Sequence, residues 1–300
     1  MNNSITFIGF GEAAYNISKG LRQEGLTDMC AYDIAVDDEK KGELIRKRAA
    51  EAGVKLMENE EEAVKSSRFV AALTSASAAE DTAKGALKFM TEEQIYVDMN
   101  SCAPTTLSEI EKLPEKGNVK ICDIAIMSSV PTSGHKVKMY LSGEGAKAFY
   151  DYFIAYHMNL NLLDAPAGGA SAIKMFKSVF SKGLPQLLLE AMVPAQEYGV
   201  LDELANSLKN TFKEKNVEEY AEAYLCKTLI HAKRRYAEVN DVVKTIESMN
   251  MDASMSRATA ERLKKLAEFG YADRLGAATE FGYREAVRLV LDDYKKKEEN

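Results

Sequence analysis

Two lysines and a serine in the stretch GGASAIKMFKS have the spacing and chemistry of a possible acid–base site. Lys174, Lys177 and Ser178 stand at positions i, i+3 and i+4, which places them on one polar stripe if the segment is helical. A lysine acts as a general acid or base when burial and neighbouring cations lower its pKa from about 10.4 toward the working pH. A polar stripe is also typical of a solvent-facing helix surface, so the spacing alone leaves both interpretations open.

This stripe follows a glycine turn at a point where the chain changes character. The segment Asp164–Gly169 separates a half in which strands and helices alternate from a half without strand-like runs. We therefore predict an α/β domain over residues 1–165 and an all-helical domain over residues 166–300. Breaks between the helices of the second domain are expected near Gly183–Pro185, Gly199, Asn250 and Gly270.

The first half predicts a doubly wound sheet. Helical runs separate successive strand-like runs, which implies parallel pairing through right-handed crossovers. The expected strands lie at residues 5–11, 29–34, 54–57, 68–75, 94–101 and 119–127. The expected helices lie at residues 12–25, 38–52, 61–67, 77–90 and 103–113. The predicted fold class is α/β, with a doubly wound Rossmann domain followed by an all-α domain.

The first strand-like run ends in GFGEAA, which has the spacing of a dinucleotide-binding turn. Gly9 permits the tight turn, Gly11 lets a pyrophosphate approach the backbone, and Ala14 is small enough for the helix to pack on the strand. The other residues of the predicted cofactor loop are Phe10, Glu12 and Ala13. A glycine turn in another α/β fold is the alternative interpretation.

Polar residues at the ends of later strands extend the predicted cofactor site. Asp33 ends the second strand, where a carboxylate binds both ribose hydroxyls of NAD and repels the 2′-phosphate of NADP. We therefore expect NAD, with NADP as the alternative, because no arginine follows Asp33 directly. Thr74, Ser75 and Asn100 are expected to line the nicotinamide side. A turn role fits each of these four residues as well.

Three motifs, in this order, resemble the β-hydroxyacid dehydrogenase family, which includes 3-hydroxyisobutyrate and 6-phosphogluconate dehydrogenases. They are GFGEAA, DIAIMSSVPTSG at residues 123–134, and GGASAIKMFKS at residues 168–178. In that family the second motif is a substrate segment, commonly Asp-Ala-Pro-Val-Ser-Gly-Gly, and the third carries a glycine-rich turn and a catalytic lysine. The resemblance covers essentially the whole chain. It is closest to a subgroup whose C-terminal domain is phosphogluconate-dehydrogenase-like and of unknown function.

The resemblance implies roles for individual residues of this chain. It makes Lys174 the acid–base residue and places Ser178 where the family has an asparagine. Where the family's substrate segment ends in Ser-Gly-Gly, this chain has Met-Ser-Ser at residues 127–129. For His135, just after this segment, contact with an anionic group and exposure to water are both open. The predicted catalytic residues are thus Lys174 and Ser178, and the predicted substrate-binding residues are Met127, Ser128, Ser129, His135 and Lys177.

The implied activity is that of an NAD(P)-dependent oxidoreductase. Such an enzyme would interconvert a small β-hydroxy acid, or a related hydroxy-amino acid, and its carbonyl form. The nicotinamide would move the hydride and the lysine the proton. Two alternatives stand beside it. One is an imine reductase-like enzyme, although relatives that reduce C=N bonds generally lack the lysine. The other is a non-catalytic dinucleotide-binding protein.

Composition limits the remaining classes of partner and location. The formal net charge of −7 argues against nucleic acid as the main partner. The four cysteines form no CxxC pair and the three histidines no HxxxH pair, so no metal site is expected. No apolar run reaches the ~18 residues of a membrane span, and the N-terminus lacks a signal-peptide pattern, so we expect a cytoplasmic protein that does not bind membranes. A small-molecule substrate and a second copy of the chain, in a homodimer, are the expected partners.

Overall fold

The computed structural model of the chain describes residues 3–275 and 281–298 and divides into two compact units. The first unit comprises residues 1–180 and the second residues 181–300. The division falls inside one helix, α8 (Gly169–Glu197). It comes later than the predicted junction at residue 165 because the first turn of α8 is hydrogen-bonded to the sheet of the first unit.

An eight-stranded sheet forms the centre of the first unit, in the order β3-β2-β1-β4-β5-β6-β7-β8. Strands β1 to β6 pair in parallel, β7 runs antiparallel to β6, and β8 is parallel to β7. The strands are β1 (Asn3–Ile8), β2 (Met29–Tyr32), β3 (Lys55–Leu56), β4 (Ser67–Ala72), β5 (Ile95–Asp98), β6 (Lys120–Ile126), β7 (Met139–Ser142) and β8 (Leu160–Leu162). The predicted doubly wound sheet is confirmed. Strands β7 and β8 are not among the predicted strands.

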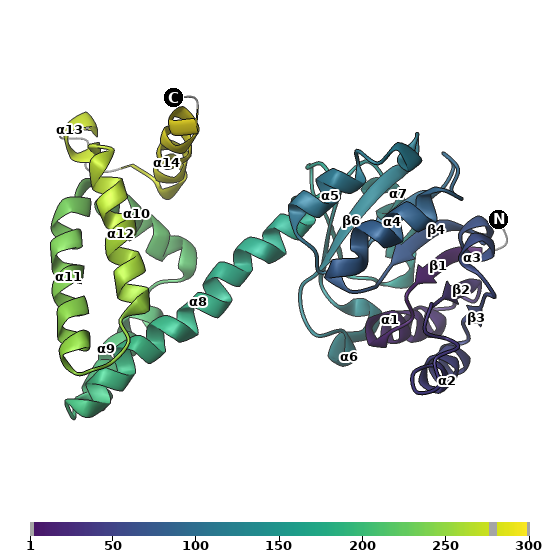
Figure 1. The fold of residues 1–300 in the computed structure, drawn as a ribbon, viewed down its shortest axis with the longest axis horizontal. Coiled ribbons are helices and arrows are strands. Elements are labelled where there is room, and N and C mark those ends of the chain that lie inside the picture. Colours follow the sequence, from purple (N-terminus) through teal and green to yellow (C-terminus); the bar gives the residue numbers. More distant parts are fainter. Residues whose placement is uncertain (1–2, 276–280, 299–300) are drawn as a thin grey trace. The chain divides into compact units, whose positions relative to one another are not determined.

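Helices cover both faces of this sheet (Figure 1). One face packs against α1, α2 and α7, and the other against α3, α4 and α5. The helices of this unit are α1 (Glu12–Gln23), α2 (Gly42–Ala52), α3 (Glu60–Ser66), α4 (Ala79–Leu87), α5 (Pro104–Ile110), α6 (Val130–Ser133) and α7 (Ala146–Phe153). Short 3₁₀ turns are η1 (Ala76–Ala78), η2 (Pro114–Lys116), η3 (Gly134–Lys136) and η4 (Ile154–Tyr156).

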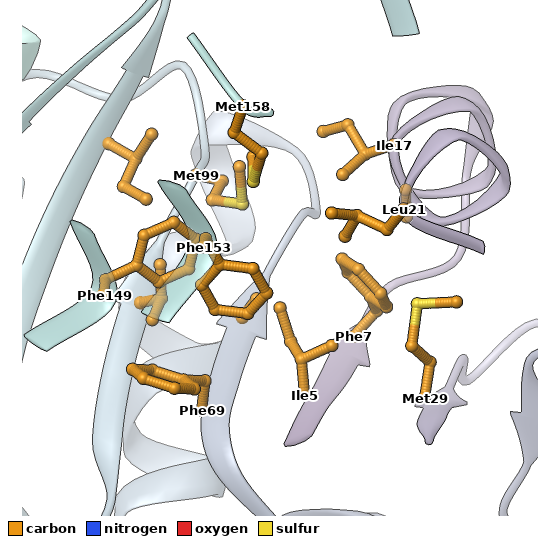
Figure 2. Packing of buried hydrophobic residues seen from close by; sticks show 14 of the residues in the cluster. Ile5, Phe7, Ile17, Leu21, Met29, Phe69, Met99, Phe149, Phe153 and Met158 are labelled. Carbon is orange, nitrogen blue, oxygen red and sulfur yellow. The ribbon is translucent and has the colours of Figure 1, made fainter. Parts of the chain in front are cut away.

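Phenylalanine rings pack among aliphatic side chains and methionines in the core on the α1 face of the sheet (Figure 2). Phe69 of β4 makes edge contacts with Phe149 and Phe153 of α7, whose rings stack on each other at 4.2 Å. Phe7 of β1 lies in the same cluster. Such aromatic pairs add specific ring geometry to the burial of a large apolar area, so they fix how the helices sit on the strands.

The second half of the chain is helical. Its helices are α8, α9 (Leu201–Glu214), α10 (Val217–Ile230), α11 (Ala232–Ser248), α12 (Ser254–Glu268), α13 (Tyr271–Leu275) and α14 (Tyr283–Glu298). The breaks predicted near Gly199, Asn250 and Gly270 are confirmed. None of the helices within 3–275 and 281–298 has the length and apolarity needed to cross a membrane.

The break predicted near Gly183–Pro185 is wrong, because α8 runs through both residues as one helix. A proline removes one hydrogen bond to the carbonyl four residues earlier, here that of Ser181. The residues that follow, LLLEAM, are strong helix formers, so the helix survives the loss.

Candidate functional site

The glycine loop has the two properties that a dinucleotide turn needs. Gly9 has φ = +87°, and a Cβ built on it would lie 2.6 Å from the carbonyl oxygen of Leu73, so only glycine fits. A Cβ on Gly11 would meet nothing within 4 Å, and Gly11 is exposed. Ala14 is fully buried under the sheet. The loop therefore packs tightly on one side and is open on the side where a ligand would approach.

Asp33 lies beside this loop, and backbone groups hold its carboxylate in place. Its Oδ2 accepts a hydrogen bond from the N–H of Phe10 at 2.7 Å, and its Oδ1 accepts one from the N–H of Ala35 at 2.8 Å. The carboxylate is thus fixed at the end of β2, next to the second residue of the loop. Ile34, which follows it, is 84% exposed.

Thr74 and Asn100 form one hydrogen-bonded unit at the carboxyl ends of β4 and β5. The Oδ1 of Asn100 accepts a hydrogen bond from the Thr74 N–H at 2.6 Å, and the Thr74 hydroxyl lies 3.3 Å from the same oxygen. The methyl of Thr74 lies where a Cβ on Gly9 would approach to 2.9 Å. The structure therefore brings Gly9, Phe10, Asp33, Thr74 and Asn100 together at one edge of the sheet.

A buried carboxylate fixes the orientation of Asn100. Asp98 is fully buried, and it accepts hydrogen bonds from both the backbone N–H and the side-chain amide of Asn100, each at 2.9 Å. Burial raises the pKa of Asp98 to about 6, although the two bonds from Asn100 act in the opposite direction. The oxygen of the Asn100 amide and one of its N–H groups are bonded, and no bond from the second N–H is seen within residues 3–275 and 281–298.

A second buried carboxylate, Asp123 of β6, fixes the start of α8. It accepts hydrogen bonds from the N–H groups of Gly168 and Ser171 at 3.0 and 2.9 Å, and from the hydroxyls of Ser171 and Ser142 at 2.7 and 3.1 Å. The Ser142 hydroxyl in turn accepts from the N–H of Ala170 at 2.9 Å. A negative charge at a helix N-terminus also interacts favourably with the helix dipole. These bonds set where α8 begins.

Lys174 follows this cap by one helical turn and is half-buried. Burial lowers its pKa from the ordinary value, and Cys102 lies close enough to act on it in the opposite direction. Burial and the neighbouring Asp98 raise the pKa of the Cys102 thiol to about 12, so the thiol is uncharged at neutral pH. Desolvation is therefore the main influence on the pKa of Lys174, and it lowers that pKa.

The other predicted residues of α8, and Ser75 just before η1, are exposed or half-buried. Lys177 is exposed, and Ser178 is half-buried with its hydroxyl donating to the carbonyl oxygen of Lys174 at 3.1 Å. The hydroxyl proton of Ser178 is therefore used in a hydrogen bond within α8, and toward a ligand the hydroxyl oxygen can act only as an acceptor. Ser75 is exposed, and its hydroxyl lies 3.1 Å from that of Ser77. Glu12 and Ala13 open α1, which no side chain of the described residues caps.

The predicted substrate segment lies at the end of β6. Met127 is half-buried, and Ser128 and Ser129 are exposed. His135 is not brought to these residues. It is buried against Gly20, in the second half of α1, with its Nε2 3.4 Å from Glu24. The expectation that it contacts an anionic ligand therefore has no support from its surroundings.

Sequence reasoning missed the residues that hold the site in place, namely Asp98, Cys102, Asp123, Ser142 and Ser171. A signal was present for the two aspartates: each is a charged residue inside or ending an apolar strand, in IYVDM and ICDIAI. A buried carboxylate requires hydrogen-bond donors around it, so such a position predicts a polar anchor. For Asp98 the donors stand close by in the sequence, at Asn100 and Cys102. For Asp123 they are not readable from the sequence, since they lie 19 to 48 residues further along the chain.

The residues present fit a dinucleotide. The uncapped N-terminus of α1 offers backbone N–H groups to a pyrophosphate, and Gly11 leaves the space above them open. The Asp33 carboxylate is fixed where a ribose would lie. No group of three or more His, Cys, Asp or Glu side chains that could hold a metal ion occurs in the part of the chain that the structure describes.

Two family models match the chain. Residues 4–101 match the family described as NADP oxidoreductase, coenzyme F420-dependent. Residues 195–266 match a domain of unknown function, DUF1932. The first match contains the glycine loop, Asp33, Thr74 and Asn100, and the second lies within the helical half. A Rossmann-like domain followed by a helical domain of unknown function is the arrangement that the sequence resemblance implied.

Relatives extend over nearly the whole chain. An uncharacterised 28.5 kDa protein of Methanothermus fervidus is 30% identical over 269 residues, which cover 88% of this chain and 99% of the relative. A conserved hypothetical protein from Sinorhizobium meliloti, of known structure, is 31% identical with a TM-score of 0.64, over 96% of this chain and 95% of that chain.

Two further solved structures share the fold. One is a conserved protein of unknown function, described as structurally similar to 3-hydroxyacid dehydrogenases. It is 27% identical with a TM-score of 0.63, over 88% of this chain and 97% of that chain. The other is a variant of an imine reductase from Myxococcus stipitatus in complex with NAD⁺. It is 17% identical with a TM-score of 0.72, over 91% of this chain and 96% of that chain. These matches confirm the resemblance to dehydrogenases with an NAD(P)-binding fold.

Proposed function

We propose that the chain is an NAD(P)-dependent enzyme with Lys174 as its acid–base residue. It belongs to the family of the 28.5 kDa protein of Methanothermus fervidus, and it combines an NADP oxidoreductase-type domain with a DUF1932 domain. The proposed reaction interconverts a small β-hydroxy acid, or a hydroxy-amino acid, and its carbonyl form.

The observation that carries the proposal is the position of Lys174. It is a half-buried lysine with a lowered pKa, one helical turn after a helix start that Asp123 anchors to β6. Asp98, on the adjacent strand β5, anchors the Asn100–Thr74 unit of the cofactor edge. Acid–base groups in enzymes need a pKa near the working pH, and desolvation is a standard way to lower that of a lysine.

In this mechanism, the bound nicotinamide would accept or supply the hydride. The residues of the chain then have to handle one proton. For oxidation of the alcohol, the neutral amine of Lys174 takes the proton of the substrate hydroxyl. For reduction, the ammonium form returns that proton to the carbonyl oxygen. Lys177 of α8, and Ser128 and Ser129 at the end of β6, would hold a substrate carboxylate.

We expect NAD to bind more tightly than NADP. The carboxylate of Asp33 is held at the end of β2 by two backbone N–H groups, so it cannot easily turn away from a ribose. A 2′-phosphate at the same place would face this negative charge. The relevant measurement is the ratio of the dissociation constants of NADH and NADPH, and equal affinities would contradict the preference.

The main experiment is a substrate screen followed by one variant and its control. β-Hydroxy acids, serine and threonine analogues and cyclic imines are incubated with each nicotinamide cofactor, and absorbance of the reduced cofactor reports turnover. With the best substrate, Lys174→Ala should lower kcat/KM by about 10²- to 10⁴-fold, the usual contribution of a general acid or base. Lys182→Ala, an exposed lysine of the same helix, should stay within about twofold of the wild type. A Lys174→Ala enzyme within a few-fold of the wild type would remove Lys174 from the mechanism.

The imine reductase alternative has one observation in its favour, the high structural similarity to an imine reductase. At 17% identity this similarity concerns the fold alone. The screen separates the two activities: turnover of cyclic imines without turnover of hydroxy acids would replace the proposed reaction. Cofactor binding without any turnover would favour a non-catalytic dinucleotide-binding protein.

A further inference from the structure

The connection between β6 and β7 rests on the helix that follows the glycine loop. It runs from residue 127 to residue 138 and contains α6 and η3. A hydrogen bond from the N–H of Met127 to the carbonyl oxygen of Lys138, 3.0 Å long, joins its two ends. Both α6 and η3 contact α1, and Figure 1 shows α6 beside α1. The segment with the proposed substrate residues 127–129 is thus a closed loop seated on α1.

The contact has a regular geometry along α1. Asn16, Gly20 and Glu24 are spaced by four residues, so they line one face of the helix. Consecutive residues of η3 follow this face. A Cβ built on Gly134 would lie 3.5 Å from the Asn16 carbonyl oxygen, and the Lys136 ammonium lies 2.8 Å from a carboxylate oxygen of Glu24.

His135 occupies the centre of this contact. Its Nδ1 lies where a Cβ on Gly20 would approach to 2.0 Å, so the ring fits only because position 20 is glycine. Its Nε2 is 3.4 Å from Glu24 and has no hydrogen-bond partner among the described residues. Burial lowers the pKa of His135, which keeps the ring neutral at neutral pH. The ring therefore acts through its shape and packing.

We propose that His135 is a positioning residue that fixes the loop of residues 127–133 on the helix that begins at the cofactor loop. The statement that this loop binds substrate rests on the proposed function, whereas the contact between His135 and Gly20 does not depend on it. Because α1 is one continuous helix that follows Gly11, a loop anchored at Gly20 keeps residues 127–129 at a constant distance from the pyrophosphate position. Loss of the anchor should therefore weaken substrate binding much more than cofactor binding.

Two variants test the anchor from its two sides. His135→Ala removes the ring, and Gly20→Ala places a methyl group where the ring lies. The control is His157→Asn. His157 also contacts Glu24, at 2.8 Å, but it follows η4 and lies outside the loop. Its φ of +56° is one that asparagine tolerates, so the control should leave the fold intact. If His135→Ala fails to fold, His135→Gln is the second variant. Its side chain is longer than that of alanine and polar, but it lacks the ring that packs on Gly20.

The first measurement is hydrogen exchange of the backbone amides of residues 127–133 in the full chain. His135→Ala and Gly20→Ala should each speed this exchange about tenfold or more, and His157→Asn should change it less than about twofold. The exchange rates test whether His135 anchors the loop, and they do so even if the chain has no activity. Unchanged rates in both anchor variants would overturn the proposal.

The second measurement separates positioning from general stability. His135→Ala should raise the KM of the best substrate about tenfold, leave kcat within about threefold and leave the dissociation constant of the reduced cofactor within about twofold. An equal loss of cofactor affinity, or an unchanged KM with a loosened loop, would overturn the positioning role. A wild-type chain that binds no nicotinamide cofactor would instead refute the proposed function. The exchange rates would still show whether His135 fixes the loop on α1.

Discussion

The two units of the chain bury their apolar side chains to different degrees. With the exception of Tyr271, the largest fully buried side chains of the described residues belong to the first unit. In the second unit, large apolar side chains of several helices face solvent, among them Leu189, Val193 and Val217. The buried clusters of the second unit are also smaller than the two that flank the sheet.

We propose that the exposed apolar side chains of the second unit, and those of α8 such as Phe176 and Val179, pack against a second copy of the chain. Large exposed apolar surfaces on a folded protein mark contact sites, because burying them is favourable by about 25 cal/mol per Å². The sheet unit also contains its own buried polar anchors, Asp98 and Asp123. We therefore expect variants of the first unit to act on folding and chemistry, and variants of the second to act on association.

The largest effect on stability is expected from Asp123→Ala in the first unit. The change leaves four donors, two N–H groups and two hydroxyls, without their acceptor in a buried place. A buried donor left without an acceptor costs about 1–3 kcal/mol, so we expect a loss of several kcal/mol in total, and urea unfolding followed by circular dichroism measures it. Asp164→Ala, an exposed aspartate just before α8, is the control and should cost less than about 0.5 kcal/mol. Equal losses in both variants would mean that Asp123 does not anchor α8.

Asp98 gives the first unit a pH dependence of its own. Its pKa in the folded chain is about 6, against an ordinary value of 3.8, so the folded state binds the extra proton between these values. The stability from this group is full below pH ~4 and is lost as pH rises through 6, by roughly 3 kcal/mol in total.

The measurement for Asp98 is the slope of unfolding free energy against pH between 4 and 6.5, in the wild type and in Asp98→Asn. The asparagine variant should lack the downward slope, whatever constant offset its altered hydrogen bonds introduce. Parallel slopes in the two proteins would show that Asp98 does not titrate there.

Local patterns explain which parts of this fold could be predicted. Gly9, Gly11 and Ala14 lie within six residues of one another, and the apolar periodicity that distinguishes strands from helices repeats every two to four residues, so both are visible in the sequence. Lys174 is predicted as the acid–base residue because a glycine turn and a family resemblance point to it. The short strands β7 and β8 carried too little periodic signal for us to predict.

The supporting contacts depend on residues that are far apart in sequence. Nothing near Asp123 shows that it caps a helix beginning at Gly169. Likewise, the packing of His135 on Gly20 joins two segments whose local patterns look ordinary. His135 was expected at a ligand because it follows the substrate segment, but a buried histidine is placed by the surface that covers it.

A moderate effect is expected from a charge on the exposed apolar surface of α8. Leu189 is 57% exposed, and Leu189→Glu keeps a good helix former at the position. If a second copy covers this surface, the variant should weaken self-association at least tenfold, or about 1.4 kcal/mol. Sedimentation equilibrium measures the change, with Asn206→Glu on α9 as a control that adds the same charge at an exposed polar position. A wild-type chain that is monomeric at micromolar concentration would refute the homodimer.

The smallest effect is expected at Gly183, inside α8 and just past the division between the units. A Cβ there would meet nothing within 4 Å, and the residue has no positive φ. Gly183→Ala should therefore stabilise the chain by about 0.5–1 kcal/mol, since alanine loses less backbone entropy in a helix. Gly9→Ala, where the added Cβ would lie 2.6 Å from a carbonyl oxygen, should destabilise it. A loss of stability in Gly183→Ala, measured by thermal unfolding, would contradict the open surroundings of Gly183 within one chain. Such a loss would mean that a second copy of the chain packs closely against α8 at Gly183.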